Sequence, residues 1–323
     1  MTSRRVVDPA GALFGLAIPL LCALAVLGLT VVWEPRLPAE VASHWSGSGA
    51  APDSFASPMS GAWTMALLIA LVGGGCSAIA ALAQAQLMMR RYMLVIGLAV
   101  TFLMATLYVA TLAVQLDVSD PAEVPFPAWS LGLGMCLGVA VGWVGALLLR
   151  DHRERLSAKT TPDLLLPRGP VELPIVDQVG TGRLTTFVLA LLVLMPVIIV
   201  CILIRNWWPM AIAIPAGFLV LSLLRFTVRV DESGVSVRNL GASSLDYDLE
   251  EIIGAKVIET RPFQDWGGWG MRIKRPHRYG LVTNTGPALV ITTESGHELT
   301  ITTERAEEMA GAINTLADRR NTV

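Results

Sequence analysis

The residues whose types could do chemistry lie in one short polar stretch between two long apolar runs. His44 and Asp53 belong to the segment LPAEVASHWSGSGAAPDSF, at 37–55. A histidine can titrate near neutral pH, bind a metal or form hydrogen bonds. A metal site would need a second histidine or cysteine nearby, because Asp53 alone leaves the coordination incomplete. No nucleophile–base pair is visible either, so we expect no catalytic residue, no metal and no cofactor.

Three interpretations of this stretch stay open. In the first it is a folded cap, with His44 as a hydrogen-bond hub under Trp45. In the second it recognises a ligand. In the third it belongs to an enzyme, which would require acidic residues of a later loop to converge on His44, namely Asp117, Asp120 and Glu123.

The composition is that of a membrane protein with a soluble domain. Hydrophobic residues make up 53% of the chain and charged residues 15%, and the mean hydropathy is +0.58. A soluble domain carries about 25% charged residues. Apolar runs fill 12–224, and charge is concentrated in the breaks and after 225. The net charge of −2 gives no reason to expect a nucleic-acid partner.

Six apolar segments are long enough to cross a bilayer as helices, which takes about 20 residues. They are 12–33, 62–84, 93–115, 129–149, 184–204 and 208–224. We expect a four-helix region at 1–149, a proline-punctuated linker at 150–183 and a helix pair at 184–224. The four cysteines lie inside apolar runs without CxxC spacing, so we expect neither a disulfide nor a metal site from them.

Basic residues mark one side of these segments. Twelve Lys and Arg residues lie in the N-terminus, the second and fourth loops and the exit of the last segment, against two in the other loops. Lys and Arg are enriched in cytoplasmic loops. We therefore expect a multi-pass protein of the bacterial inner membrane with cytoplasmic N- and C-termini, and with 37–55 outside.

The spans contain no charged side chain, although a transporter or pump normally carries some. The third span has the most polar stripe, since Thr101, Tyr108 and Gln115 share a face at seven-residue spacing. Hydrogen bonding between helices explains this stripe as well as a substrate path would.

The fourth span contains a doubled GxxxG pattern formed by Gly134, Gly138 and Gly142. A helix face without side chains lets another helix approach closely. Its partner is either a helix of the same bundle or the same face of a second copy, which would make a homo-oligomer.

After residue 225 the hydrophobic period changes to two, which predicts strands. The expected strands are FTVRVD, VSVRN, LDYDL, IIGAKVIE, GMRIKR, YGLVTN, PALVITT and LTITT. An apolar stripe of Met309, Ile313 and Leu316 predicts a terminal helix. We expect 225–323 to form a small β barrel whose open end this helix closes.

The segment 37–55 resembles the outer-loop motif of a bacterial membrane family of unknown function, which includes the Sdp-type immunity proteins. The residues that fit are Leu37, Pro38, His44, Trp45, Gly49, Asp53 and Phe55. Ala42 stands where proline is common, and Ser46 where asparagine is common. The resemblance covers the first four spans and implies a membrane protein; some members of the family protect a cell from its own toxic peptide.

The region 184–320 resembles the bacterial pleckstrin-homology-like domains that follow a pair of membrane helices. DYDLEEIIGAKV fits their early strands and DWGGWGMR fits a mid-domain motif. The loop either docks on anionic headgroups or is a structural bulge with buried tryptophans. Its candidate residues are Trp266, Gly268, Trp269, Arg272, Lys274 and Arg275.

Together these features predict a non-enzymatic membrane protein that serves sensing, immunity or scaffolding in the cell envelope. Its partners would be the lipid bilayer and, at the cytoplasmic domain, anionic headgroups or a protein. The alternative is a transporter or channel-like protein for a small or peptide substrate, which would need a polar route along the third span.

Overall fold

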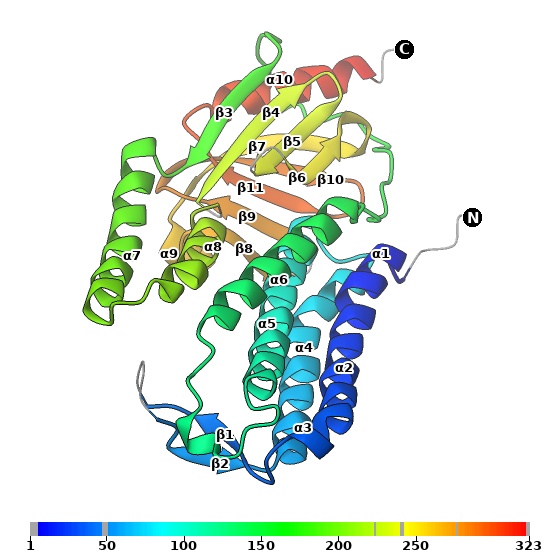
Figure 1. Ribbon diagram of the computed structural model, residues 1–323. Coiled ribbons are helices and arrows are strands. Elements are labelled where there is room, and N and C mark those ends of the chain that lie inside the picture. Colours follow the sequence, from blue (N-terminus) through cyan, green and yellow to red (C-terminus); the bar gives the residue numbers. More distant parts are fainter. Residues whose placement is uncertain (1–5, 47–50, 223, 240–241, 276, 321–323) are drawn as a thin grey trace. The chain divides into compact units, whose positions relative to one another are not determined.

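The computed structural model of the chain divides into a helical unit and a β-rich unit (Figure 1). The structure describes residues 6–46, 51–222, 224–239, 242–275 and 277–320. The helical unit takes in Met1–Arg153 and Leu192–Gly217. The β-rich unit takes in Glu154–Leu191 and Phe218–Val323.

Among the described residues, five helices are long and apolar enough to cross a membrane, which indicates a membrane protein. They are Pro9–Arg36 (α1, Pro9–Ala12, and α2, Ile18–Trp33), Pro58–Ala81 (α3, Pro58–Leu68, and α4, Gly74–Ser77), α5 (Leu87–Ala113), α6 (Trp129–Leu148) and α7 (Arg183–Leu203). A sixth apolar helix, α8 (Trp208–Ser222), has 15 residues. The expected sixth span therefore corresponds to a helix shorter than the other five.

The glycine stripe of α6 packs against α5 of the same chain. A Cβ atom added at Gly138 would lie 2.5 Å from the carbonyl oxygen of Leu98, so only glycine permits this approach. Gly134 and Gly142 lie similarly close to the same helix. In lipid no hydrophobic driving force brings apolar helices together. Small residues such as glycine let the two backbones come close, and the resulting van der Waals contact holds the helices together.

A buried arginine joins three segments at one end of the helical unit. The Arg90 side chain is 0% exposed and forms an ion pair with Asp8. Its Nε donates to the carbonyl oxygen of Ala80 (3.0 Å), and its Nη1 donates to that of Arg150 (2.8 Å). His152 Nε2 lies 3.3 Å from the Asp8 carboxylate. All three guanidinium nitrogens of Arg90 therefore donate hydrogen bonds, which a buried charge needs in order to be stable.

Asp8 also begins the first helix. Its Oδ1 accepts hydrogen bonds from the backbone N–H groups of Ala10 (2.9 Å) and Gly11 (3.2 Å), which is the usual N-cap arrangement before a proline at the first helical position. Burial alone would raise the pKa of Asp8, but the hydrogen bonds from Arg90 and Gly11 outweigh it and lower that pKa. The carboxylate therefore stays ionised beside Arg90.

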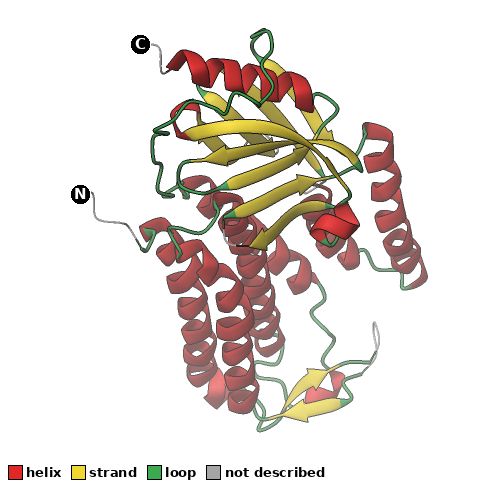
Figure 2. Ribbon diagram, turned by 180° about the vertical axis from the view of Figure 1, so that it is seen from behind, coloured by secondary structure: helices red, strands yellow, loops and turns green. Residues whose placement is uncertain are grey.

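The β-rich unit contains two open sheets (Figure 2). The four-stranded sheet is antiparallel, in the order β3 (Ile175–Gly180), β4 (Arg225–Asp231), β5 (Gly234–Asn239), β6 (Ala242–Asp248). The five-stranded sheet has the order β7 (Ile252–Thr260), β10 (Gly286–Thr293), β11 (Glu298–Thr302), β9 (Arg278–Val282), β8 (Gly270–Arg275). The period-two pattern explains the strands, because alternate residues such as Val228 and Val230 are buried while Arg229 is exposed.

The expectation of a closed barrel plugged by a helix was wrong. Within the described residues no strand pairing joins the two sheets, so each keeps two edges. Strand β9 pairs in parallel with β11, which leaves β8 at an edge of its sheet. The terminal helix α10 (Ala306–Arg320) packs on β7 and β10 instead of closing an end. There the Asn314 side chain bonds the N–H (2.8 Å) and carbonyl oxygen (2.7 Å) of Ala255.

Part of the expected linker at 150–183 is a strand. Strand β3 pairs with β4 from Ile175, opposite Val230, to Gly180, opposite Arg225. Ile175 is 1% exposed, so it belongs to the core of the β-rich unit. The sequence did not reveal this strand, because its partner follows only after the whole helix pair.

Replacing Arg90 by methionine should destabilise the helical unit, because Asp8 would keep a buried charge without its partner. We expect the free energy of unfolding in detergent micelles to fall by about 3–5 kcal/mol. A denaturant titration followed by circular dichroism would measure this loss.

The matched control is the double variant Arg90→Met/Asp8→Asn, which removes both charges. It should recover a substantial part of the stability, because the uncompensated carboxylate is gone. Equal losses in the single and double variants would show that the ion pair is not what Arg90 contributes.

Candidate functional site

A short hairpin closes one end of the helical unit, and we call it the cap. It consists of β1 (Val41–His44) and β2 (Ser54–Ala56), which pair antiparallel. The Ser43 hydroxyl donates to the carbonyl oxygen of Ser54 (3.1 Å) across the pair. Gly49, one of the expected motif residues, lies outside the described residues. Except for Ala56, the cap falls within the segment that the sequence marked at 37–55.

His44 and Asp53 form a pair that closes the hairpin. His44 Nδ1 lies 2.6 Å from Asp53 Oδ1, and the Asp53 N–H donates to the carbonyl oxygen of His44 (3.0 Å). Hydrogen bonds from Ser46 and then from His44 hold the pKa of Asp53 below its usual value. The two side chains are 67% and 40% exposed. His44 therefore faces solvent and ties the hairpin together, and it is not a hub beneath Trp45.

Trp45 joins the cap to the next loop of the helical unit. Its indole N–H donates to the carbonyl oxygen of Val124 (3.0 Å). Its ring lies 5.4 Å, centroid to centroid, from that of Phe126 in a tilted arrangement. Aromatic packing and a satisfied indole N–H both restrict the loop.

A buried glutamine holds the cap from the other side. The Ala42 N–H donates to Gln115 Oε1 (2.7 Å), and Gln115 Nε2 donates to the carbonyl oxygens of Ala42 (3.2 Å) and Thr111 (2.9 Å). Both Ala42 and Gln115 are 0% exposed. A proline at position 42, common in the resembling motif, would have no N–H to donate. With alanine at position 42, both the backbone N–H and the carbonyl oxygen can bond the Gln115 side chain.

Leu37 and Pro38 end the helix that enters the cap. The Leu37 N–H donates to the carbonyl oxygen of Glu34 (3.2 Å), which closes the last turn. Pro38 follows directly, and its ring cannot continue a helix. The apolar side chain of Leu37 packs against the core beneath the cap.

Two of the three acidic residues that a catalytic site would need, Asp117 and Asp120, have other partners. Asp117 forms an ion pair with Arg36, which holds the pKa of Asp117 below its usual value. Asp120 Oδ1 accepts a hydrogen bond from the Ala122 N–H (2.9 Å) in its own loop. In the described part of the chain, no three His, Cys, Asp or Glu side chains gather as ligands for a metal ion. His44 is thus paired with Asp53 alone among these acids.

A partly enclosed cavity of about 280 Å³ lies between the cap, α3 and α5. Its walls are mainly apolar and come from Val41, Met65, Leu107, Leu112 and Phe126. Hydroxyl groups line it as well, from Ser43, Ser57, Ser60, Thr64, Thr111 and Tyr108. A mostly apolar wall with a few polar groups is what a small-molecule site usually presents.

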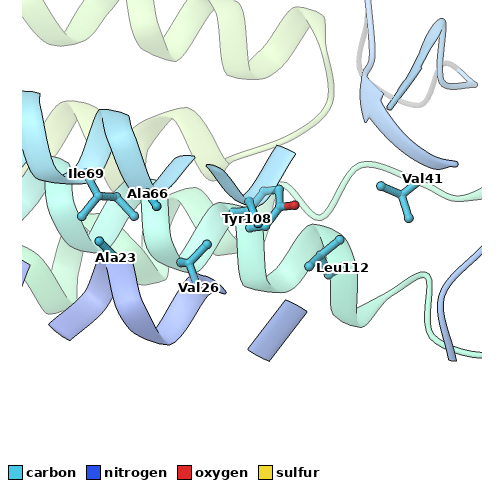
Figure 3. Packing of buried hydrophobic residues seen from close by; sticks show 8 residues of the cluster. Ala23, Val26, Val41, Ala66, Ile69, Tyr108 and Leu112 are labelled. Carbon is cyan, nitrogen blue, oxygen red and sulfur yellow. The ribbon is translucent and has the colours of Figure 1, made fainter. Parts of the chain in front are cut away.

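Tyr108 links this cavity to the core of the helical unit. Its ring belongs to the buried cluster that contains Ala23, Val26 and Ile69 (Figure 3). Its hydroxyl donates to the carbonyl oxygen of Pro58 (2.5 Å). The ring position is therefore fixed by packing below and by a hydrogen bond at its tip.

The polar stripe predicted on the third span is divided among three roles. Tyr108 lines the cavity, Gln115 clamps the cap, and Thr101 is buried against Gly73. Thr101 and Gln115 do not line the cavity. Packing between segments accounts for both of them.

The tryptophan loop lies in the β-rich unit, away in sequence from the cap. Trp266 ends the short helix α9 (Pro262–Trp266) and is half-buried, whereas Trp269 is 62% exposed. Gly268 is buried between them, and its φ of 140° is positive. Exposed basic side chains follow on β8, namely Arg272, Lys274 and Arg275.

Sequence reasoning missed the clamp on Ala42 and the cavity beneath it. Gln115 stood out as a polar residue at the end of an apolar helix, but nothing local shows that its partner is Ala42. The ion pair of Arg90 was missed too. The Asp8–Pro9 dipeptide is a helix-start signal that could have placed Asp8 at a helix end.

Comparison with known proteins points to the same stretch. A family model described as a domain of unknown function, DUF1648, matches residues 20–70. That range holds most of α2, the whole cap and all of α3. No curated protein and no solved structure matched the chain. The match is consistent with an uncharacterised membrane family and names no activity.

Replacing Gln115 by leucine should open the cap, because both polar backbone groups of Ala42 would be buried without partners. Each such group costs about 1–3 kcal/mol, so amide exchange over 41–45 should become roughly tenfold to a hundredfold faster. Hydrogen–deuterium exchange with mass spectrometry on the purified full-length protein would measure it.

Gln84→Leu is the matched control, because Gln84 donates to the carbonyl oxygen of His152 (3.0 Å) and does not contact the cap. It should leave exchange over 41–45 unchanged. If both variants accelerated exchange there equally, the effect would be a general loosening and not the loss of the clamp.

Proposed function

We propose that the chain is a multi-pass protein of the bacterial inner membrane that recognises an apolar or amphipathic ligand in the cavity beneath the cap, without chemistry on it. The cavity of about 280 Å³ is the observation that carries the proposal. Such a protein would serve sensing, immunity or scaffolding in the cell envelope. The likeness of 37–55 to the Sdp-type immunity proteins supports immunity among these roles.

The lining of the cavity indicates the class of ligand. Apolar walls bind by removing apolar surface from water, at about 25 cal/mol per Å². Hydroxyl groups, such as those of Ser60 and Thr64, add hydrogen bonds that fix orientation. No charged side chain lines the cavity among the described residues. A small apolar molecule, or one or two large side chains of a peptide, fits this combination.

The cap supports recognition because it is held at three places. The His44–Asp53 pair closes the hairpin, Trp45 attaches it to the neighbouring loop, and Gln115 clamps Ala42. A site that is already ordered loses less entropy when a ligand binds. The anchors thus support a preformed binding site.

The transporter alternative needs a polar route that continues from the cavity. Tyr108 would be the entrance to such a route, yet Gln115 is occupied by Ala42 and Thr101 is packed against Gly73. In the described spans the charged side chains lie at the helix ends, and the buried one, Arg90, is paired with Asp8. These contacts favour recognition over passage.

The proposed orientation places six crossings in the membrane, with α8 as the sixth and both termini in the cytoplasm. In a variant whose four native cysteines are replaced by alanine, Ser43→Cys and Trp207→Cys should react with a membrane-impermeant thiol reagent in intact cells. Glu307→Cys should react only after permeabilisation. Labelling of Glu307→Cys in intact cells would show that the proposed orientation is reversed. Protection of Trp207→Cys would show that α8 is not a sixth crossing.

Filling the cavity should abolish the biological response. Thr64 lines the cavity from α3, so Thr64→Phe would place a ring in the space that a ligand needs. In a deletion strain exposed to toxic peptides and envelope stresses, the wild-type gene should restore tolerance to at least one agent. Thr64→Phe should fail to restore it at an equal level of protein in the membrane.

Leu67→Phe is the matched control for this variant. Leu67 lies on the same helix, is 58% exposed and does not line the cavity. It should restore tolerance as fully as the wild-type gene. Full restoration by Thr64→Phe would show that the cavity is not the recognition site.

A further inference from the structure

The two tryptophans of the DWGGWGMR loop have opposite surroundings. The ring of Trp266 lies over Gly280 of β9, where an added Cβ atom would come within 2.7 Å of it. Trp269 is 62% exposed. Gly267 and Gly268, both with positive φ, turn the chain between them, and Gly270, also with positive φ, follows Trp269. One indole therefore fixes the loop to the sheet while the other is presented outward.

Trp269 does not stand alone on this surface. Phe263 of α9 is 63% exposed, and its ring lies 4.9 Å from that of Trp269 in an edge-to-face arrangement. Large aromatic side chains are rarely left so exposed side by side unless they meet a partner. Phe263 and Trp269 thus form a small exposed apolar surface.

Exposed basic side chains follow the aromatic pair on β8. Arg272, Lys274 and Arg275 of β8 are exposed, and Lys274 also interacts electrostatically with the Asp265 carboxylate. The Lys274 ammonium lies 5.8 Å from the centre of the Trp266 ring. The nearby carboxylate of Asp265 accepts hydrogen bonds from the Arg261 N–H (2.7 Å) and the Thr260 hydroxyl (3.2 Å). The surface keeps a net positive charge.

We propose that this surface docks on a bilayer that carries anionic headgroups. We call it the aromatic–basic patch and define it as Arg261, Phe263, Trp269, Arg272, Lys274 and Arg275. Indole and phenyl rings insert at the headgroup level, and Lys and Arg beside them bind lipid phosphates. An apolar surface alone would suit many partners, but exposed aromatic rings together with four basic side chains and one nearby carboxylate, that of Asp265, suit an anionic membrane.

The covalent path of the chain supplies a second argument for this partner. Strand β4 begins at Arg225, three residues after α8 ends at Ser222. Strand β3 likewise ends at Gly180, three residues before α7 begins at Arg183. These short links keep the β-rich unit close to the membrane that α7 and α8 enter. The effective concentration of its surface at that membrane is therefore high. Weak individual contacts are then enough to hold it there.

The test uses the full-length protein in nanodiscs of phosphatidylcholine, with or without phosphatidylglycerol. Hydrogen–deuterium exchange over 262–275 should be slower with phosphatidylglycerol, and high salt should remove the difference. The variant Arg272→Gln/Lys274→Gln should lose the protection, with roughly tenfold faster exchange. Phe263→Ala/Trp269→Ala should lose it as well.

The matched control, Arg238→Gln/Lys256→Gln, removes the same charge from exposed positions on other strands. It should keep the protection, and exchange in β10 should stay unchanged in every variant as evidence of an intact sheet. Equal protection in both lipids, or its persistence in the charge variant, would overturn the proposal. The outcome is independent of the cavity, because none of these residues lines it.

Discussion

Two fully buried polar side chains, Arg90 and Gln115, hold the helical unit together at the ends of its longest helix. An apolar interior offers an unpaired polar group nothing to bind, so each must find partners within the protein. Arg90 binds Asp8 and the carbonyl oxygen of Ala80, and Gln115 binds both polar backbone groups of Ala42. Each contact joins segments far apart in sequence. Between them, glycine contacts and apolar clusters complete the packing.

The clamp at Ala42 explains how the cap is able to cover a cavity without collapsing into it. Gln115 fixes β1 from below, while Trp45 holds the following residues to another loop. The His44–Asp53 pair then only has to close the hairpin, which explains why it is exposed to solvent. A histidine that looks like a catalytic or metal-binding residue in the sequence thus has a structural role here, through its bond to Asp53.

Long apolar runs made the helices predictable, and period-two alternation made the eight later strands predictable. The short polar stretch between two apolar runs gave the position of the cap. Which distant residue or strand a given residue or strand will contact cannot be recognised from the sequence around it. Gln115 meets Ala42 across 73 residues of chain, and β3 pairs with a strand beyond two helices. The same limit applies to Trp266 and Trp269, whose types are identical. Trp266 packs over Gly280, which follows it by 14 residues, while Trp269 is exposed.

The charges around the cap decide what kind of ligand the cavity would select. Arg36 forms an ion pair with Asp117, and the His44 ring lies within hydrogen-bond distance of Asp53, so both of these carboxylates already have partners. Inside, the described lining offers hydroxyl groups and apolar surface. The described lining carries no charged side chain that would bind a charged ligand. Selectivity must then rest on shape, buried apolar area and a few hydrogen bonds, which is the physics of recognising an apolar group rather than a charged metabolite.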